Sequence, residues 1–330
     1  MAKSPASKKN VASSRRPATQ ASNRTPTRTP TRAPAKSSGG RPAGLFTWLA
    51  VGLVVVIVAT LVIIKVASGG TTTPGDSTIS PVNPTTFAQL TGVPMSVFNT
   101  VGVSSQVVQV SAPIPLKGQP PLTAKNSAGA TVPEVFYLGA EYCPYCAAQR
   151  WPTIIALSRF GTFSNLGNMS SYAHDTYPNT PSFTFVKATY TSKYIVFKTI
   201  EEYTNYLNKT TGYYQTLQKP TKAEEALVVK YDTPKFVPGL TKSEGNPIPF
   251  ITFDNKFLVS GASYSPDTLS NLSRASVAAG LSDSSSPVTD AIIASANYQT
   301  ASICSLTNNE PSNVCTSSGV MAAKKAMKIK

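Results

Sequence analysis

Residues 133–152 constrain the fold more than any other stretch, because they join an apolar run to a Cys-X-X-Cys motif and a helix-forming segment. The β-formers at 135–138 predict a short buried strand. The residues after Cys143 are strong helix formers, and Pro144 occupies a position suited to a first helical turn. This order predicts a helix over 143–160 with Cys143 at its N-terminus.

The pair Cys143 and Cys146 predicts a site of thiol–disulfide exchange. Backbone N–H groups and the helix dipole favour a thiolate at a helix N-terminus. Cys146 lies one helical turn further on, close enough to attack a mixed disulfide on Cys143. Zinc binding is a weaker alternative, because Cys304 and Cys315 are eleven residues apart and lack the close spacing of a second ligand pair. A purely structural disulfide between Cys143 and Cys146 is a further alternative.

The N-terminal region predicts a tail and a membrane anchor. The first 44 residues contain ten Lys or Arg and no acidic residue, with no apolar periodicity, so we expect a disordered basic tail over 1–44. Residues 45–64 carry no charge and, at about 1.5 Å per residue, would span about 30 Å. We expect an uncleaved single-pass anchor over 45–66 in the cell membrane. The basic tail would stay cytoplasmic and the remainder would lie outside.

The rest of the chain predicts one α/β domain over 85–316, reached through a Gly/Thr/Pro-rich linker at 67–84. It is only mildly basic, and the charge of the tail is explained by a neighbouring membrane, so no nucleic-acid partner is expected. Apolar runs on either side of Asp254-Asn255 predict a hairpin. We expect helices at 85–101, 201–208, 222–232, 265–279 and 288–306, strands at 183–190 and 194–197, and a flexible basic tail at 317–330.

A strand, a Cys-X-X-Cys at a helix start, Pro152 inside that helix and Ile248-Pro249 before a hairpin together resemble the thioredoxin superfamily. The inner dipeptide Pro-Tyr is that of glutaredoxins. The resemblance implies that Pro249 is cis and packs beside the dithiol, and that the backbone of Ile248 faces the substrate. An ordinary edge-strand proline is the alternative for Pro249. We also predict that Tyr145, between the two cysteines, binds substrate.

More narrowly, residues 137–151, 260–264 and 303–315 resemble a family of membrane-anchored prokaryotic proteins of the DUF929 type. That resemblance implies a thioredoxin-like fold and says little about substrate. Pro152 lies one residue further from the first cysteine than in thioredoxins. The separation of 103 positions from Cys146 to Pro249 implies a helical insertion at about 198–245. Four tyrosines of this insertion could line a substrate groove, although ordinary packing is the stronger expectation. They are Tyr203, Tyr206, Tyr213 and Tyr214.

Three further features have both a structural and a chemical interpretation. Cys304 and Cys315 predict a structural disulfide in an exported chain, with a second redox pair as the alternative. Glu141 could shuttle the proton of Cys146 or raise a thiol pKa, but an exposed turn residue is the stronger expectation. His174, the single histidine, predicts a loop residue, because no Ser/Asp arrangement surrounds it.

The sequence therefore predicts a thioredoxin-like α/β protein that exchanges disulfides outside the cytoplasm through Cys143 as an exposed nucleophile and Cys146 as the resolving thiol. Protein thiols and disulfides are the expected substrates, the lipid bilayer is a partner, and a membrane redox protein is a further candidate. No cofactor or metal is expected. The rival interpretations are a non-catalytic binding module and a redox partner subunit of a membrane quinone-linked oxidase.

Overall fold

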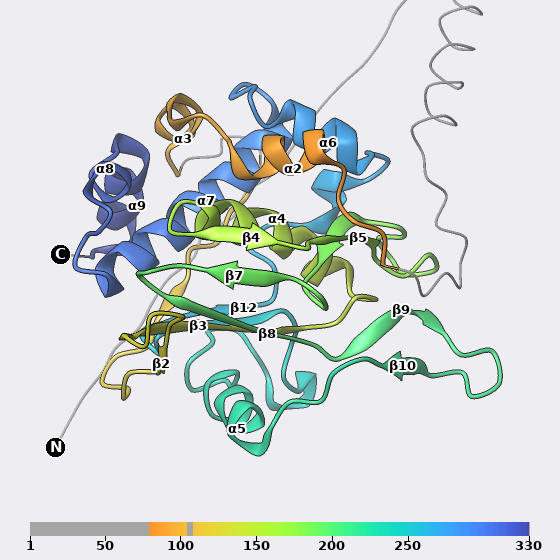
Figure 1. Ribbon diagram of the computed structural model, residues 1–330. Helices are drawn as coiled ribbons and strands as arrows, with labels where there is room; N and C mark the ends of the chain where they lie inside the picture. Colours follow the sequence, from red (N-terminus) through yellow and green to blue (C-terminus); the bar gives the residue numbers. More distant parts are fainter. Residues whose placement is uncertain (1–78, 104–107, 330) are drawn as a thin grey trace, which may run out of the picture. The chain divides into compact units, whose positions relative to one another are not determined.

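The main sheet is built around β3 (Thr131–Gly139), a nine-residue strand whose last six residues are buried. It pairs antiparallel with β11 (Phe250–Phe253) and parallel with β8 (Val196–Glu201), and its first residues pair antiparallel with β2 (Thr123–Lys125). Figure 1 shows this sheet in a computed structural model that describes residues 79–103 and 108–329. The predicted buried strand at 135–138 is confirmed.

A hairpin continues the sheet on the other side of β3. β12 (Phe257–Ser260) pairs antiparallel with β11, and β1 (Ile114–Pro115) lies beyond it, which gives the order β1-β12-β11-β3-β2 with β8 also paired to β3. Asp254 and Asn255 form the connecting turn with φ angles of 53° and 54°. Asn and Asp tolerate this left-handed conformation, so the hairpin predicted from Asp254-Asn255 is confirmed.

Both faces of the sheet are buried, because successive side chains of β3 point to opposite sides. Val135 and Tyr137 belong to one hydrophobic cluster, and Phe136 and Leu138 belong to another. The first cluster contains core residues of α4 (Pro144–Ser158), while the second cluster contains residues of α5 (Lys222–Tyr231) and the loop after it. A run of consecutive apolar residues such as 135–138 in β3 is typical of a sheet covered on both sides.

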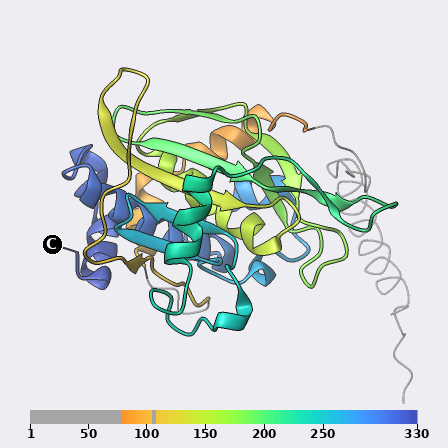
Figure 2. The same cartoon turned by 90° about the horizontal axis from the view of Figure 1, so that it is seen from below.

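The helices fall into two groups around this sheet. α5 (Lys222–Tyr231) covers one face, as Figures 1 and 2 show. The helices that share the other cluster are α2 (Pro84–Thr91), α3 (Met95–Val101), α4, α6 (Arg274–Gly280), α7 (Pro287–Leu306), α8 (Ser312–Cys315) and α9 (Ser318–Met327). Short 3-10 turns occur at η1 (Lys242–Glu244) and η2 (Pro266–Leu269). The predicted helices at 85–101, 222–232 and 288–306 are confirmed, the first as the pair α2 and α3.

The prediction of a helix at 201–208 is wrong. It forms the end of β8 and then β9 (Tyr203–Leu207), which pairs antiparallel with β10 (Tyr214–Thr216). Tyr and Thr favour strands, and pairing with residues further along the chain decides the outcome. The insertion predicted as helical therefore begins as a hairpin, which projects to one side of the main sheet in Figure 1, and only then forms α5.

Two other predicted elements are divided. The strand expected at 183–190 breaks into β6 (Pro181–Thr184) and β7 (Thr189–Thr191), which pair with different strands, β5 (Gly167–Ser170) and β4 (Thr162–Ser164). The helix expected at 265–279 breaks into η2 and α6, because Ser270–Ser273 separate them and Asn271 has a φ of 61°. The strand expected at 194–197 begins two residues later, as β8.

The predicted ends of the domain also change. The flexible tail expected over 317–330 is wrong for α9, whose Val320 and Ala323 are fully buried in the main core. At the other end, the linker expected over 67–84 finishes in ordered structure, since Pro81 bridges Gly167 and the Val82 amide donates to Leu166. The tail predicted at 1–44 and the anchor at 45–66 lie outside the described residues.

Candidate dithiol site

β3 and α4 position the two cysteines. β3 ends at Gly139, a short turn follows, and Cys143 is the N-cap residue of α4, with Pro144 at the first helical position. The Cys143 Sγ accepts a hydrogen bond from the Cys146 backbone N–H at 3.2 Å. A cysteine here takes the place that a Ser or Asp oxygen usually fills at a helix start. Negative charge on this sulfur is therefore favoured by an N–H donor and the helix dipole.

Both thiols are free and both are buried. Cys143 is 5% exposed and Cys146 is 0% exposed. The prediction that Cys143 is an exposed nucleophile is therefore wrong. One cause is the loop before β11: the Ile248 carbonyl oxygen lies 3.7 Å from Cys143 Sγ and accepts a hydrogen bond from its thiol. Cys143 is therefore the slightly more accessible of the two thiols.

The two thiols have opposite electrostatic environments. Burial opposes ionisation of Cys143, but hydrogen bonds from Cys146 and the positive charge of Arg150 outweigh burial and hold the pKa of Cys143 below its ordinary value. Burial raises the pKa of Cys146 well above the ordinary thiol value, and the neighbouring Cys143 raises it further. Cys143 is thus the thiol that ionises first, and Cys146 keeps its proton.

Ile248, Pro249 and Tyr145, which were predicted to contact substrate, lie in segments that reach the dithiol: the loop before β11 and the first turn of α4. The Ile248–Pro249 peptide bond is cis, as the resemblance implied, and the Ile248 carbonyl faces Cys143. Tyr145 lies between the cysteines at the start of α4 and is 44% exposed. Its ring packs edge-on against Tyr177, with centroids 5.9 Å apart. An exposed aromatic side chain beside a reactive sulfur is suited to contact a docked polypeptide.

Glu141 differs from its expected role as an exposed turn residue. It is 6% exposed, and its Oε1 has no hydrogen-bond partner among the described residues. Burial raises the pKa of Glu141 to about 7, and a hydrogen bond with the Thr184 side chain offsets part of this effect. The Glu141 amide donates to the Tyr203 carbonyl at the start of β9, so the hairpin that was predicted as a helix helps to enclose this turn.

A buried ion pair that was not predicted from the sequence lies near the dithiol. Arg150 on α4 and Glu201 at the end of β8 are both 0% exposed. Arg150 Nε and Nη2 donate to Glu201 Oε1 and Oε2 at 2.8 and 2.5 Å, and Nη2 also donates to the Ala140 carbonyl at 3.0 Å. The one signal in the sequence was the position of Arg150, one helical turn after Cys146 on the same face.

Tyrosines from several segments gather around the turn that leads into Cys143. Tyr142 stacks on Tyr214 of β10 with centroids 4.1 Å apart and an interplanar angle of 8°. Tyr172 packs edge-on against Tyr214 at 5.5 Å, and Tyr203 lies 6.3 Å from Tyr142. His174 packs edge-on against Tyr172 of this cluster, with centroids 5.4 Å apart. Two of the four insertion tyrosines therefore pack near the dithiol.

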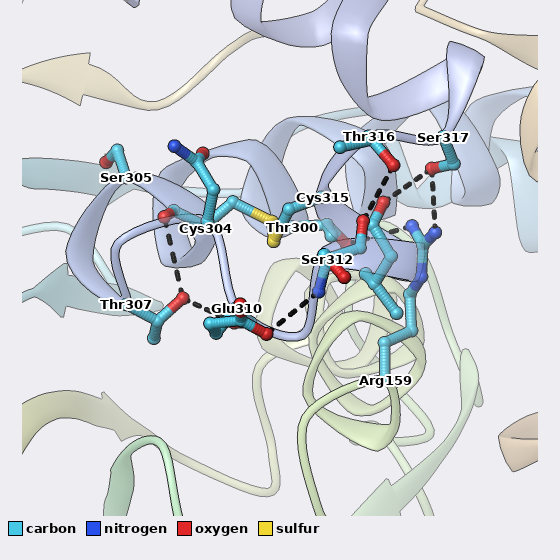
Figure 3. The surroundings of a disulfide bond; sticks show 12 residues. Arg159, Thr300, Cys304, Ser305, Thr307, Glu310, Ser312, Cys315, Thr316 and Ser317 are labelled. Carbon is cyan, nitrogen blue, oxygen red and sulfur yellow. Dashed lines mark hydrogen bonds between the residues drawn. A yellow bond between two sulfur atoms is a disulfide. The ribbon is translucent and has the colours of Figure 1, made fainter.

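The second cysteine pair is a disulfide within the C-terminal helices. Cys304 in the last turns of α7 is bonded to Cys315 at the end of α8, and both residues are 0% exposed. Figure 3 shows the surrounding hydrogen bonds, which include Arg159 Nη2 donating to Ser317 at 3.2 Å. The predicted bond between Cys304 and Cys315 is present, and its burial separates it from solvent thiols.

The fold and this site define a mixed α/β protein with a Cys-X-X-Cys pair at the N-terminus of a helix. The chain belongs to the family described as Domain of unknown function (DUF929), whose family model matches residues 122–305. The match includes Cys143, Cys146 and Pro249. No curated protein and no solved structure matched the chain. Within residues 79–103 and 108–329, no helix is long and apolar enough to cross a membrane.

Proposed function

We propose that this protein is a thiol–disulfide oxidoreductase that acts on protein cysteines through Cys143 and Cys146. The observation that carries the proposal is the position of Cys143. Its sulfur caps α4, accepts the Cys146 N–H at 3.2 Å and lies 3.7 Å from the Ile248 carbonyl. A thiol with a lowered pKa, a second thiol one turn away and an adjacent backbone for substrate alignment are the elements that disulfide exchange needs.

The proposed reaction has two exchange steps. The Cys143 thiolate attacks a substrate disulfide R–S–S–R′, which forms Cys143–S–S–R and releases R′–S⁻. Cys146 then loses its proton, which R′–S⁻ takes up, and attacks the Cys143 sulfur. The products are the Cys143–Cys146 disulfide, R–S⁻ and R′–SH. Because each step is reversible, the same residues also oxidise a substrate dithiol when the enzyme begins as the disulfide.

We further propose that the fold is thioredoxin-like. The support comes from the features that carried the resemblance: β3 leading into the Cys143 helix, Pro152 inside α4, and a cis Pro249 directly before the β11–β12 hairpin and beside the dithiol. The insertion then consists of the β9–β10 hairpin and α5. In this interpretation the Ile248 backbone aligns an extended substrate strand across Cys143.

The proposed location is the outer side of a cell membrane, with a single N-terminal anchor. The support is the uncharged run at 45–64 after ten basic residues. A buried disulfide between Cys304 and Cys315 agrees with an oxidising compartment, where such bonds persist. There the enzyme would meet newly exported protein thiols, and a membrane redox protein would restore its oxidation state.

The second candidate function is a non-catalytic binding module in which Cys143 and Cys146 stay permanently paired. The burial of Cys143, at 5% exposure, favours this candidate, because substrate sulfur must reach the Cys143 sulfur in line with the bond that breaks. The reaction of Cys143 with oxidised glutathione distinguishes the two functions.

Trapping a mixed disulfide tests the proposal. The full-length reduced chain and its Cys143→Ser and Cys146→Ser variants are mixed with oxidised glutathione, and adducts are located by peptide mass spectrometry. Cys146→Ser should accumulate glutathione on residue 143, because the resolving thiol is absent. The wild type should pass to the Cys143–Cys146 disulfide, and Cys143→Ser should react far more slowly at Cys146. Equal reactivity of both single variants, or no adduct in either, would sink the enzyme proposal.

A further inference from the structure

Cys146 lies in an enclosure that contains two unused hydrogen-bond donors. The Cys146 side chain is 0% exposed. In the part of the chain that the structure describes, the buried Tyr137 hydroxyl and the buried Arg150 Nη1 have no hydrogen-bond partner. Leaving such groups unpaired in a protein interior costs free energy, and native proteins do so rarely. Two of them beside one buried thiol call for an explanation in terms of that thiol.

Gly139 shows how close the Tyr137 hydroxyl comes to the sulfur. A Cβ added at Gly139 would overlap the Tyr137 hydroxyl and would lie 3.1 Å from Cys146 Sγ. The hydroxyl and the sulfur therefore lie against the same point of the backbone, on the side where Gly139 carries no side chain. Tyr137 is held there by β3 and by the ring of Phe185, whose centroid is 5.1 Å away.

Glu201 fixes Arg150 so that its positive charge lies close enough to Cys146 to influence its ionisation. Glu201 binds Nε and Nη2, which leaves Nη1 as the free arm of the guanidinium. Arg150 follows Cys146 by four residues, so the two side chains share one face of α4. Its guanidinium carbon also lies 5.8 Å from the centre of the Tyr137 ring. The charge favours the thiolate form of Cys146.

The second exchange step needs this assistance, because it requires negative charge on a sulfur that water cannot reach. Burial is the largest influence on Cys146 and raises its pKa well above the ordinary thiol value. In the resting dithiol this keeps Cys146 protonated. Once Cys143 is in a mixed disulfide, Cys146 has to ionise in place, and donors inside the protein must replace the missing water.

We propose that the Tyr137 hydroxyl and the Arg150 guanidinium, held by Glu201, are positioning groups that stabilise the Cys146 thiolate during the resolving step. The inference rests on the proposed exchange function and assigns residues to its second half. As Cys146 loses its proton to the released R′–S⁻, the Tyr137 O–H and the Arg150 Nη1–H turn their unused hydrogen bonds to the new thiolate. The titratable and charged neighbours of Cys146 are Cys143 and Arg150 on its own helix, Tyr137 on β3, Glu141 and Tyr142 in the turn before α4, and Glu201 at the end of β8.

Tyr137→Phe is the matched test, because it removes one oxygen that has no hydrogen-bond partner among the described residues. Tyr231→Phe is the control. Tyr231 is also 0% exposed with an unpartnered hydroxyl in the described part of the chain, but it belongs to the second hydrophobic cluster. Losing an unsatisfied oxygen should leave the unfolding midpoint unchanged or slightly higher in both variants.

The readout separates the two exchange steps. The reduced full-length chain is mixed with oxidised glutathione between pH 5 and 9, quenched at intervals, and the glutathione adduct and internal disulfide are quantified by mass spectrometry. Adduct formation is also measured in a Cys146→Ala background, which isolates the first step. Tyr137→Phe should leave adduct formation within twofold of wild type. It should slow adduct resolution about tenfold at pH 7 and raise its pH midpoint by about one unit.

A second variant removes the buried charge without leaving an unpaired ion. Arg150→Gln with Glu201→Gln keeps two amides in place of the salt bridge, and it should also raise the pH midpoint of resolution. Because Arg150 acts on Cys143 as well, adduct formation should slow in this variant, unlike in Tyr137→Phe. If the double variant does not fold, the Tyr137→Phe profile decides alone.

The outcomes distinguish this inference from the proposed function. If the wild type forms no glutathione adduct at Cys143, the exchange function fails. If the wild type forms and resolves the adduct but Tyr137→Phe has the same pH profile as Tyr231→Phe, the function stands and the role of Tyr137 is overturned. If Tyr137→Phe slows both steps equally at every pH, a structural role replaces the proposed one.

Discussion

The sulfur of Cys143 lies 3.7 Å from the carbonyl oxygen of Ile248, although 105 residues separate them in the chain. This approach joins the start of α4 to the loop before β11. It places a backbone acceptor next to the thiol that has the lowered pKa. Under the proposed function, we therefore predict that a substrate reacting with Cys143 contacts Ile248 and Tyr145.

Replacing Tyr145 should separate polypeptide substrates from small ones. Tyr145→Ala removes a ring that is 44% exposed beside Cys143, and we expect about a fivefold loss of kcat/KM with a disulfide-bonded peptide, which is about 1 kcal/mol. The rate with oxidised glutathione should change less than twofold. Tyr213→Ala is the matched control, since Tyr213 is 76% exposed in the turn between β9 and β10. An equal loss in both variants would argue against a Tyr145 contact.

The stability of the protein should depend on the ionisation of Glu141. Its folded pKa of about 7 is raised above the ordinary value of 4.5, so its protonated form favours folding. This contribution is complete below about pH 4.5 and is lost as the pH rises through 7. Between pH 5 and 8, wild type should lose about 2.5 kcal/mol more stability than Glu141→Gln.

Denaturant unfolding of wild type, Glu141→Gln and Glu225→Gln across this range measures the effect. Asp232, whose pKa burial raises to about 6, adds to the wild-type slope, so the difference between variants isolates Glu141. Glu225→Gln, on α5, should follow wild type. If the stability of Glu141→Gln depends on pH in the same way as that of wild type, water hydrates the carboxylate or the turn rearranges when Glu141 ionises.

The buried pair of Arg150 and Glu201 should show strong coupling. Arg150→Met or Glu201→Leu alone leaves an unpaired charge in the core and should cost about 3–5 kcal/mol of unfolding free energy. The double variant should be at least about 2 kcal/mol more stable than the sum of the two losses predicts. A double-mutant cycle by chemical denaturation measures this term. Additive losses would contradict direct pairing in solution.

Removing the Cys304–Cys315 disulfide should affect stability and leave exchange unchanged. The bond closes a short loop, with a sequence separation of 11, so Cys304→Ala with Cys315→Ala should cost about 3 kcal/mol in denaturant unfolding. Rates of glutathione exchange at Cys143 should remain within twofold of wild type below the unfolding transition. A selective loss of oxidised product at Cys143 and Cys146 would instead reveal a second redox pair.

The elements around the dithiol could be predicted because their signals are local. A continuous apolar run predicted β3, a proline at a helix start predicted α4, and Asp254-Asn255 predicted the β11–β12 turn. The failure at 201–208 has a nonlocal cause, since those residues pair with β10. Their local composition suits either a polar helix or a strand, and the pairing partner decides.

The burial within the site could not be predicted for a related reason. Glu141 is enclosed because its turn is hydrogen-bonded to the start of β9, and a segment assigned as a helix gave no reason to expect that cover. Arg150 pairs with Glu201, which lies fifty-one residues further along the chain. The spacing of two charged residues does not predict a pair at such a separation. The cysteines were found because a motif and its flanking elements lie within twenty residues.

The redox equilibrium of Cys143 and Cys146 with glutathione tests the central claim most directly. The full-length chain is equilibrated across ratios of reduced to oxidised glutathione, and the state of this pair is determined by alkylation and peptide mass spectrometry, with Cys304 and Cys315 left intact. The account predicts a single reversible transition with a potential between about −120 and −270 mV, the range of known dithiol enzymes. A pair that never equilibrates with glutathione, in either direction and over hours, would contradict it.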